Sequence, residues 1–373
     1  MILPHASRWR LLCLRFDRIR DHRVFLQSMT VLGHPISPQN LEVLEIVKTG
    51  DYIELSAPSF WPDDKLIFKN GATSKLTWLR VRAFRDGLFP FSFHTITFLQ
   101  IDKADFMTLK EFECVAQLPA LVSLSLSDAE IDAFETPSRP VIAPKLRYFR
   151  YQSNCIMFCL WRLLKAPCLE LLIFKDVVIE DGNREYSFDP VDRQECDHFP
   201  SLKTIGFINC DVFSLEDSND KFLLHLAQAT PDVTRLMILY TEEDHIILPR
   251  ILEHGDVTYW PNLTTVFYSD KMLSQEDINI IRTRIAEMLK HQATTKPQKH
   301  CTYQICNSHL NVLNAEEGDS RDRWKSLQTG EFYDIICSGN VQEVPEWCSW
   351  PSELSTEFYY SSEEDFDPDF STT

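Results

Sequence analysis

The sequence predicts a solenoid of the α/β class, in which similar units stack side by side around a continuous core. One observation is a recurring pattern, often a proline, one or two residues, and then Leu-x-x-apolar-x-apolar, as in the stretch from Leu118 to Leu126. A second is the distance between copies, which start 20 to 35 residues apart. A third is the low glycine content, 10 residues in 373, which disfavours a turn-dense barrel and glycine-rich nucleotide-binding loops.

Each copy supplies three apolar residues at the spacing of a strand that buries one face. Units of roughly 20 to 29 residues, each with one strand and a returning segment, are typical of leucine-rich repeats. We expect a leucine-rich-repeat-like solenoid, a curved parallel sheet with outer helices and about ten irregular repeats. The triplets are Trp9, Leu12, Leu14; Leu41, Leu44, Ile46; Leu76, Leu79, Val81; Ile96, Leu99, Ile101; Leu121, Leu124, Leu126; Leu146, Phe149, Tyr151; Leu169, Leu172, Phe174; Leu202, Ile205, Phe207; Val233, Leu236, Ile238; and Leu263, Val266, Tyr268.

Helical patterns precede several strand-entry prolines and explain how the chain returns from one parallel strand to the next. Residues 108–117 place apolar side chains three apart, with Thr108 positioned to cap the first turn and Pro119 to prevent continuation. The last of the further helices is expected to cap the array, because an uncovered end exposes the core. These further helices are expected over 154–165, 218–228 and 274–291.

Charge separates a repeat region from an acidic end. The net charge is -18, and residues 315–373 hold 15 acidic against three basic side chains, a balance of -12. The first 35 residues are basic, with six arginines against two aspartates. An acidic balance of this size disfavours nucleic-acid binding. We expect residues 1–292 to form the repeat domain, 293–351 an irregular appendage, and 352–373 a disordered tail with seven acidic and no basic side chains.

Cysteine usage and the start of the chain predict the compartment. The 11 cysteines are scattered without a pairing pattern. The first residues do not show the charged segment followed by an apolar segment that is typical of a signal peptide. No apolar run approaches the roughly 20 residues of a membrane span. We therefore expect reduced thiols, a cytoplasmic or nuclear location, and no membrane partner.

Residue types that carry chemistry do not fall at the spacings that catalysis or metal binding requires. The sequence contains no Gly-x-Ser-x-Gly turn and no His-Glu-x-x-His helix. His300, Cys301, Cys306 and His309 could supply four zinc ligands, but they lack the two-residue separation usual between paired cysteines. We expect no catalytic residue, no metal and no cofactor. An enzyme whose site is assembled from distant residues is the weaker alternative.

The opening of the chain resembles a known family. The text PHASRWRLLCL from Pro4 to Leu14, followed by strand entries LPAL, APKL, APCL, FPSL and WPNL, is similar to fungal F-box proteins with degenerate leucine-rich repeats. The resemblance covers residues 1 to about 292 and implies the recognition half of an SCF ubiquitin ligase receptor. In that family an F-box precedes the opening and binds the Skp adaptor. Met1 lies eight residues before Trp9, so we expect Skp binding only if an upstream F-box exists.

Alternation along each strand places the residues between the buried ones on the concave face of the arc. In the third to sixth repeats this face gathers arginines and aromatics, which are the residue types most often found at binding hot spots. In an acidic molecule, such arginines indicate a protein partner with acidic or phosphorylated groups. The alternative is an ordinary solvated surface. The candidate residues are Trp78, Arg80, Arg82, Phe98, Gln100, Tyr148 and Arg150.

The acidic tail is itself an anionic peptide. We expect residues 363–369 to fold back on Arg80, Arg82 and Arg150 and to compete with partners. The whole sequence predicts a non-enzymatic protein-interaction scaffold, the substrate-recognition part of an F-box-type ubiquitin ligase receptor that lacks its F-box. The alternative is a free-standing leucine-rich-repeat binding protein unrelated to ubiquitination.

Overall fold

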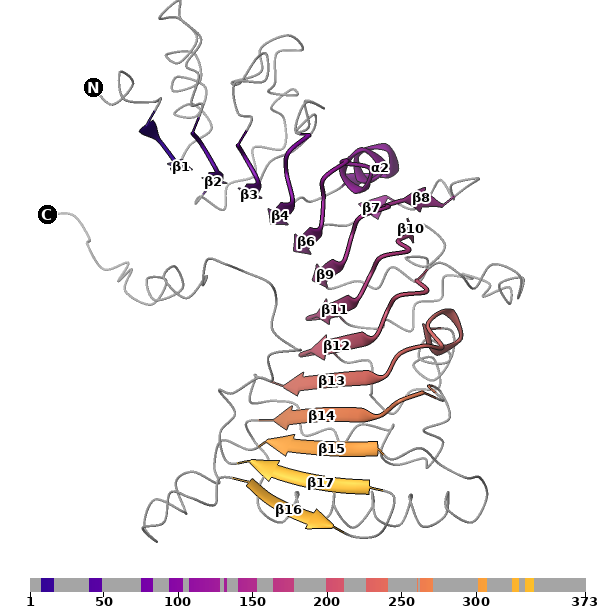
Figure 1. Cartoon of the computed structure of the whole chain (residues 1–373). Helices are drawn as coiled ribbons and strands as arrows, with labels where there is room; N and C mark the ends of the chain where they lie inside the picture. The colour runs from indigo at the N-terminus through magenta and orange to yellow at the C-terminus, as the bar shows by residue number, and fades with distance from the viewer. Residues whose placement is uncertain are drawn as a thin grey trace, which may run out of the picture.

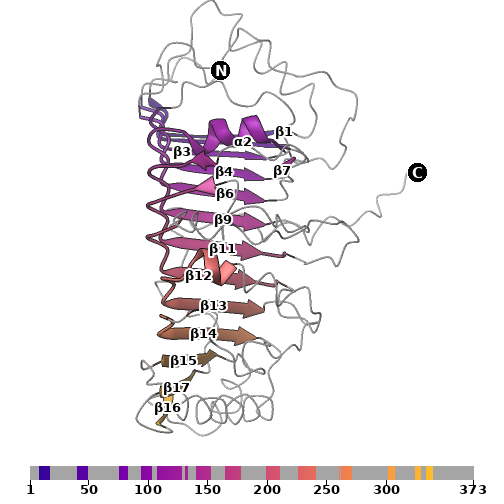
Figure 2. The same cartoon turned by 90° about the vertical axis from the view of Figure 1, so that its right-hand side faces the viewer.

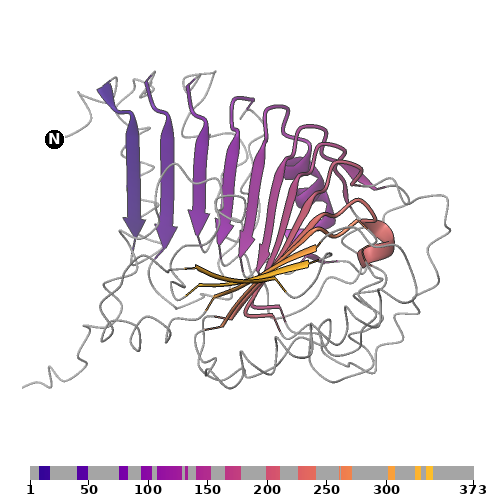
Figure 3. The same cartoon turned by 60° about the horizontal axis from the view of Figure 1, so that its bottom comes forward.

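The structure, a computed structural model, places most of its strands in one long sheet that follows an arc (Figure 1). Figure 2 shows these strands stacked in a single column. Their direction turns gradually from one end of the sheet to the other (Figure 3), as the handed twist of strands requires. The described residues are 8–16, 40–48, 75–82, 94–102, 107–127, 131–132, 140–152, 164–177, 199–210, 226–240, 260, 262–270, 301–306, 324–328 and 333–338.

Ten strands form a run in which each strand pairs in parallel with the next. This arrangement, with short described connections, is consistent with the expected leucine-rich-repeat-like solenoid. The strands are β1 (Leu11–Phe16), β2 (Val43–Lys48), β3 (Trp78–Arg82), β4 (Phe98–Asp102), β6 (Ser123–Ser127), β9 (Tyr148–Gln152), β11 (Leu171–Lys175), β12 (Thr204–Ile208), β13 (Arg235–Tyr240) and β14 (Thr265–Asp270).

Successive strands start in register because one carbonyl in each repeat accepts two hydrogen bonds from the next repeat. The carbonyl of Thr97, for example, accepts from the backbone N–H groups of Val122 and Ser123 at 2.8 and 2.9 Å. The same pair of bonds recurs at all nine junctions of the ten strands. Threonine hydroxyls reinforce several junctions, as where Thr97 Oγ1 donates to the carbonyl of Thr77 at 3.1 Å. Register is therefore independent of the length of chain between strands.

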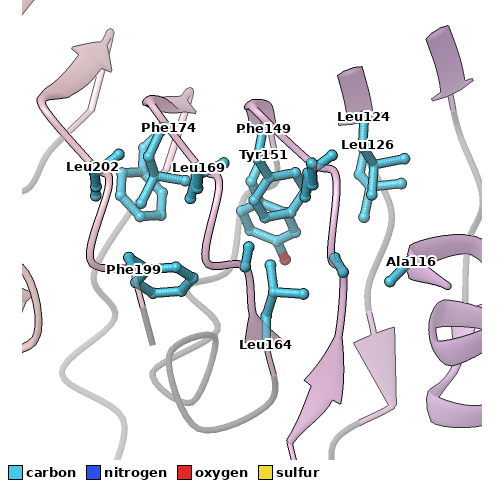
Figure 4. Close-up of a cluster of buried hydrophobic side chains, with 14 of the residues drawn as sticks. Ala116, Leu124, Leu126, Phe149, Tyr151, Leu164, Leu169, Phe174, Phe199 and Leu202 are labelled. Carbon is cyan, nitrogen blue, oxygen red and sulfur yellow. The ribbon is translucent and has the colours of Figure 1, made fainter. Parts of the chain in front are cut away.

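The expected triplets form the core of the sheet. From the second to the tenth repeat, none of their side chains is more than 6% exposed. Figure 4 shows part of this core, where Leu124, Phe149 and Phe174 come from neighbouring strands and face the same side. Full burial of such a side chain contributes roughly 1.5–3 kcal/mol, so the triplets make a large favourable contribution to folding. The sequence pattern is confirmed at each of these positions.

Helix α2 (Leu109–Ala116) confirms the helix expected over 108–117. Thr108 caps it, since its hydroxyl accepts from the backbone N–H of Glu111 at 3.3 Å while the Glu111 carboxylate accepts from the Thr108 N–H at 2.8 Å. This reciprocal capping box satisfies two N–H groups that a helix start leaves unpaired. Beyond the helix, Pro119 follows the C-cap at Gln117.

Helix α2 also defines the two faces of the sheet. Its buried residues Phe112 and Val115 belong to the same core as the triplets, so the core face of the sheet is the face toward α2. Figure 1 shows α2 outside the arc. The opposite face, which we call the inner face, therefore lines the inside of the arc.

Short strands contribute to the outer side in addition to helices. β5 (Met107–Thr108) pairs with β7 (Ile131–Asp132), and β8 (Val141–Ile142) pairs with β10 (Leu164–Lys165), both in parallel. Prolines at 140 and 144 flank β8, and they would not be accommodated in the interior of a helix. In the described part of the chain, short strands therefore form part of the outer layer that the sequence predicts to be helical.

The other expected helices have different outcomes. The helix over 154–165 is wrong at its end, because Leu164 and Lys165 form β10, where β8 offers a strand partner; residues 153–163 lie outside the described residues. The helix over 218–228 is confirmed in its described part, where residues 226–229 are helical. The capping helix over 274–291 lies outside the described residues.

The sheet continues beyond β14. β15 (Cys301–Cys306) pairs in parallel with β14, β17 (Tyr333–Ser338) pairs in parallel with β15, and β16 (Trp324–Gln328) pairs antiparallel with β17. These strands come from the segment 293–351, so three parts of the expected irregular appendage belong to the sheet. They lack the proline and leucine entry pattern, which explains why the repeat analysis missed them. The boundary at residue 292 and the tail 352–373 stay predictions.

Candidate partner-binding surface

The seven candidate residues lie on the inner face of β3, β4 and β9, and β6 lies between β4 and β9. Strand register arranges them in rows that cross the four strands. We call the twelve residues of these rows the polar patch. The first row is Trp78, Phe98, Ser123 and Tyr148; the second is Arg80, Gln100, Ser125 and Arg150; the third is Arg82, Asp102, Ser127 and Gln152.

The first row is aromatic, with one small residue. The rings of Trp78 and Phe98 stack with centroids 5.4 Å apart and planes 12° from parallel. Ser123 separates Phe98 from Tyr148 and is 4% exposed. Among the described residues, the buried atoms Trp78 Nε1 and Ser123 Oγ have no hydrogen-bond partner. A buried polar group in this state costs about 1–3 kcal/mol, so the row holds hydrogen-bonding capacity that the chain itself does not use.

Arg80 is the centre of a buried hydrogen-bond network in the second and third rows. Its Nε donates to Asp102 Oδ2 at 2.8 Å, and its Nη1 donates to Glu45 Oε1 at 3.0 Å. All three side chains are at most 9% exposed. Gln100 Nε2 donates to both Asp102 oxygens, at 3.0 and 3.2 Å, and Cys13 Sγ donates to Glu45 Oε2 at 3.1 Å. The network joins β1, β2, β3 and β4.

This network changes the role expected for Arg80. One guanidinium faces two carboxylates, so the local charge of Arg80, Glu45 and Asp102 is -1 rather than positive. Releasing Arg80 to bind an anion would leave both carboxylates buried without their cation, which is costly. The expected contact of Arg80 with residues 363–369 or with an acidic partner does not fit this arrangement. Arg82 and Arg150 are the other two cations of the polar patch.

Arg147 is a residue of this region that the candidate set missed. It precedes β9, donates to both carboxylate oxygens of Glu170 at 2.9 and 2.8 Å, and lies over the Tyr148 ring at 5.4 Å. The hydrogen bonds to Glu170 raise the pKa of Arg147 above its ordinary value. The sequence indicated this pair, because Arg147 and Glu170 each stand directly before a strand in neighbouring repeats. Arg10 and Glu42 form the same kind of pair at 2.7 Å.

The inner face becomes apolar after β9. The residues Leu171, Ile173, Met237, Leu239 and Phe267 form a second buried cluster there, separate from the main core. Met237 and Phe267 are 0% exposed. Tyr148 packs against the edge of this cluster, which we call the apolar cluster, so the polar patch ends where it begins.

Gly206 fits the apolar cluster because it lacks a side chain. A Cβ at this position would lie 2.5 Å from Met237 Cε and 3.3 Å from Ile173 Cγ1. Strand register places Gly206 between these two residues on β12. The glycine therefore lets the side chains of β11 and β13 meet across β12.

Side-chain hydrogen bonds link the carboxyl ends of β9, β11 and β12 next to the polar patch, and we call these bonds the polar ladder. Asp176 and Asn209 have φ of 52° and 50°, a left-handed conformation that Asp and Asn tolerate better than most residues. Asn209 Nδ2 donates to Asp176 Oδ1 at 3.2 Å, and Gln152 Nε2 donates to Asp176 Oδ2 at 2.7 Å. The ladder fixes Gln152, the last residue of the third row.

The described part of the chain contains no helix long and apolar enough to cross a membrane. Its His, Cys, Asp and Glu side chains form no group of three or more that could hold a metal ion. His300 and His309 lie outside the described residues, and the side chains of Cys301 and Cys306 are not described.

No protein-family model matches the chain, and a search of the curated proteins found no match. The resemblance to fungal F-box proteins therefore stays a prediction from the opening motif and the strand entries.

Proposed function

We propose that this chain is a non-enzymatic protein-interaction scaffold that binds a protein partner on the polar patch. The observation that carries the proposal is the first row, where Trp78, Phe98 and Tyr148 are in register and two buried polar atoms have no partner. Aromatic anchors beside desolvated polar groups are typical of binding hot spots. Trp78 and Tyr148 are partly exposed and would supply the contact surface, whereas Trp78 Nε1 and Ser123 Oγ are covered by the chain itself and would meet a partner only after a local rearrangement.

The second part of the proposal concerns the chemistry of the partner. Glu45, Arg80 and Asp102 sum to -1, whereas Arg82 and Arg150 add +2, so this part of the inner face carries +1 in a chain of -18. An acidic or phosphorylated group of the partner would lie toward Arg82, because Arg80 is already engaged by carboxylates. This net charge of the inner face is small, so shape complementarity and hydrogen bonding contribute more to partner binding than net charge does.

The finer proposal is that the partner is a substrate of a ubiquitin ligase. It is supported by the opening motif at residues 4–14 and by the strand entries that resemble fungal F-box proteins. Pull-down of the Skp adaptor with the full natural product of the gene tests this finer proposal alone. Absence of Skp would favour a free-standing repeat protein and would leave the partner-binding proposal intact.

Quantitative affinity capture tests the partner-binding proposal. The chain and its Arg82→Ala and Tyr148→Ala variants are used as baits in extracts of the cells that make it. Lys110→Ala is the matched control, since Lys110 is exposed on α2 and lies on the opposite side of the sheet. Thermal unfolding of each bait verifies that the fold is retained.

The proposal predicts a partner whose recovery falls about tenfold or more with either patch variant, the size of a hot-spot loss of roughly 1.4 kcal/mol. Recovery with Lys110→Ala should equal that of the unmodified chain. If every captured protein is recovered equally by all four baits, the polar patch is not the binding surface.

A further inference from the structure

The β1 end of the sheet differs from every other repeat. In the part of the chain that the structure describes, β1 is the last strand at one end of the sheet and pairs with one strand, β2. At the opposite end, the sheet does not stop at β14 but continues through β15 and β17 to the antiparallel strand β16. An edge strand presents a row of backbone N–H and C=O groups, which makes it the natural place for an extended segment to bind.

Apolar surface accompanies this edge. The first triplet, Trp9, Leu12 and Leu14, is only partly buried, whereas the later triplets are at most 6% exposed. Leu11 is 53% exposed and is one of two exposed large hydrophobic residues in the described part of the chain. The β1 end therefore exposes side chains of the types that every later repeat buries.

The same end is basic. Arg8 is exposed, and the Arg10 side chain is 75% exposed even though it pairs with Glu42. In the sequence, these two belong to the six arginines of the first 35 residues, which face only two aspartates. A segment that binds here should be extended, acidic and rich in large apolar side chains.

We propose that the β1 end is a docking site for the C-terminal segment of the same chain, residues 352–373. This segment has seven acidic and no basic side chains, and it carries five aromatic residues that could cover the exposed apolar surface. Charge complementarity and aromatic content select it over the rest of the chain. The aromatic residues are Phe358, Tyr359, Tyr360, Phe366 and Phe370.

Chain length allows this contact within one molecule. From β1 to β17 the sheet has 11 strand spacings, and at about 4.8 Å each this is about 53 Å. Glu363 follows Ser338, the last residue of β17, by 363 minus 338, or 25 residues. Twenty-five residues span up to about 80 Å when extended, so residues 363–369 can reach β1. This site replaces Arg80 as the binding position for the tail, because Arg80 is engaged by Glu45 and Asp102.

A competition experiment tests the docking site. A fluorescently labelled peptide of residues 352–373 is added to the full chain, and its binding is measured by anisotropy at low salt. The comparison variant neutralises the tail of the chain with Glu363→Gln, Glu364→Gln, Asp365→Asn, Asp367→Asn and Asp369→Asn. The matched control makes the same charge change elsewhere, with Glu316→Gln, Glu317→Gln, Asp319→Asn, Asp322→Asn and Glu331→Gln.

The peptide should bind the tail-neutralised chain about tenfold or more tightly than the unmodified chain, because a tethered competitor acts at an effective concentration near the millimolar range. The control should behave like the unmodified chain. Adding Leu11→Asp to the tail-neutralised chain should abolish binding, whereas adding Arg82→Ala should not, which separates this site from the polar patch. No binding to the tail-neutralised chain, or binding that survives Leu11→Asp, would overturn the proposal.

Discussion

On the inner face, strands β2 to β9 carry ion pairs, hydrogen-bonding side chains and an aromatic row, whereas β11 to β14 carry the apolar cluster at equivalent strand positions. The core face is the same in both halves, since its triplets are buried throughout. The backbone junctions are also the same, because the paired hydrogen bonds to one carbonyl recur at every repeat. The repeat therefore fixes one face and leaves the other to vary.

We propose that this difference separates stability, which depends on the apolar cluster, from recognition on the polar patch. Side chains at 0% exposure, such as Met237 and Phe267, contribute to folding through burial and have no surface to offer a partner. The polar patch instead includes the partly exposed side chains of Trp78 and Tyr148, which a partner can contact. Substitutions in the two halves should consequently differ in what they change.

Phe267→Ala in the apolar cluster should give the largest loss of stability. Phe267 is fully buried, and removing such a ring costs about 3–5 kcal/mol through lost transfer free energy and the cavity left behind. Urea unfolding followed by tryptophan fluorescence measures the loss. Ile142→Ala is the control, because Ile142 is 52% exposed and should change stability little. A loss for Phe267→Ala no larger than the control's would mean that this half of the inner face is not a core.

Arg80→Ala should give a slightly smaller loss, about 3 kcal/mol, because it leaves Glu45 and Asp102 buried without their cation. A double-mutant cycle with Asp102→Asn measures the coupling. Since the two groups are in direct contact at 2.8 Å, their effects should be strongly non-additive. Additive effects would show that the network is not formed, and would return Arg80 to the set of cations available to a partner.

Gly206→Ala tests how closely the apolar cluster is packed. The added Cβ would meet Met237 Cε at 2.5 Å, and overpacking of this kind costs about 1–3 kcal/mol, with the lower end expected because the Met237 terminus is flexible. In a Met237→Ala background the same substitution should cost much less. Equal costs in both backgrounds, measured by urea unfolding, would contradict the packing of β12 between β11 and β13.

Arg10→Ala should have the smallest effect, confined to the β1 end. The hydrogen bond from Arg10 lowers the pKa of Glu42 below its ordinary value of 4.5. A carboxylate whose pKa is lowered by folding stabilises the folded state. This stabilisation is fully present at pH values above the ordinary pKa and is lost as the pH falls through the lowered pKa. In Arg10→Ala the pKa of Glu42 should rise toward 4.5, as NMR titration would show. An unchanged pKa would mean that the Arg10 and Glu42 pair is absent in solution.

The fold was predictable from sequence because every repeat requires the same local pattern of buried residues. A buried triplet such as Leu121, Leu124 and Leu126 needs only alternation along a strand, which is a property of the backbone. The cap at Thr108 was equally local, since a capping box lies within four residues. Strands β15 to β17 were missed, because they join the sheet without the repeat pattern.

The polar patch was predictable in position but not in chemistry. Strand register was enough to bring Trp78, Phe98 and Tyr148 into one row. The engagement of Arg80 depends on Glu45 and Asp102, which are 35 and 22 residues away along the chain. The sequence contained both acids, but only aligned repeats place them beside Arg80. The apolar cluster was missed because β11 and β13 carry apolar residues on both faces, so alternation does not distinguish the inner face from the core face there.

Hydroxyl-radical footprinting tests the central claim most directly, with the partner recovered by affinity capture. Trp78 and Tyr148 are only partly buried in the unbound chain and report on the polar patch, while Cys168 is exposed beyond β10 and serves as the reference. Partner binding should lower the oxidation of Trp78 and Tyr148 severalfold, leave Cys168 unchanged, and leave Met237 as protected as before. Unchanged oxidation of Trp78 and Tyr148 in the presence of bound partner would contradict the claim that the polar patch is where this protein recognises another.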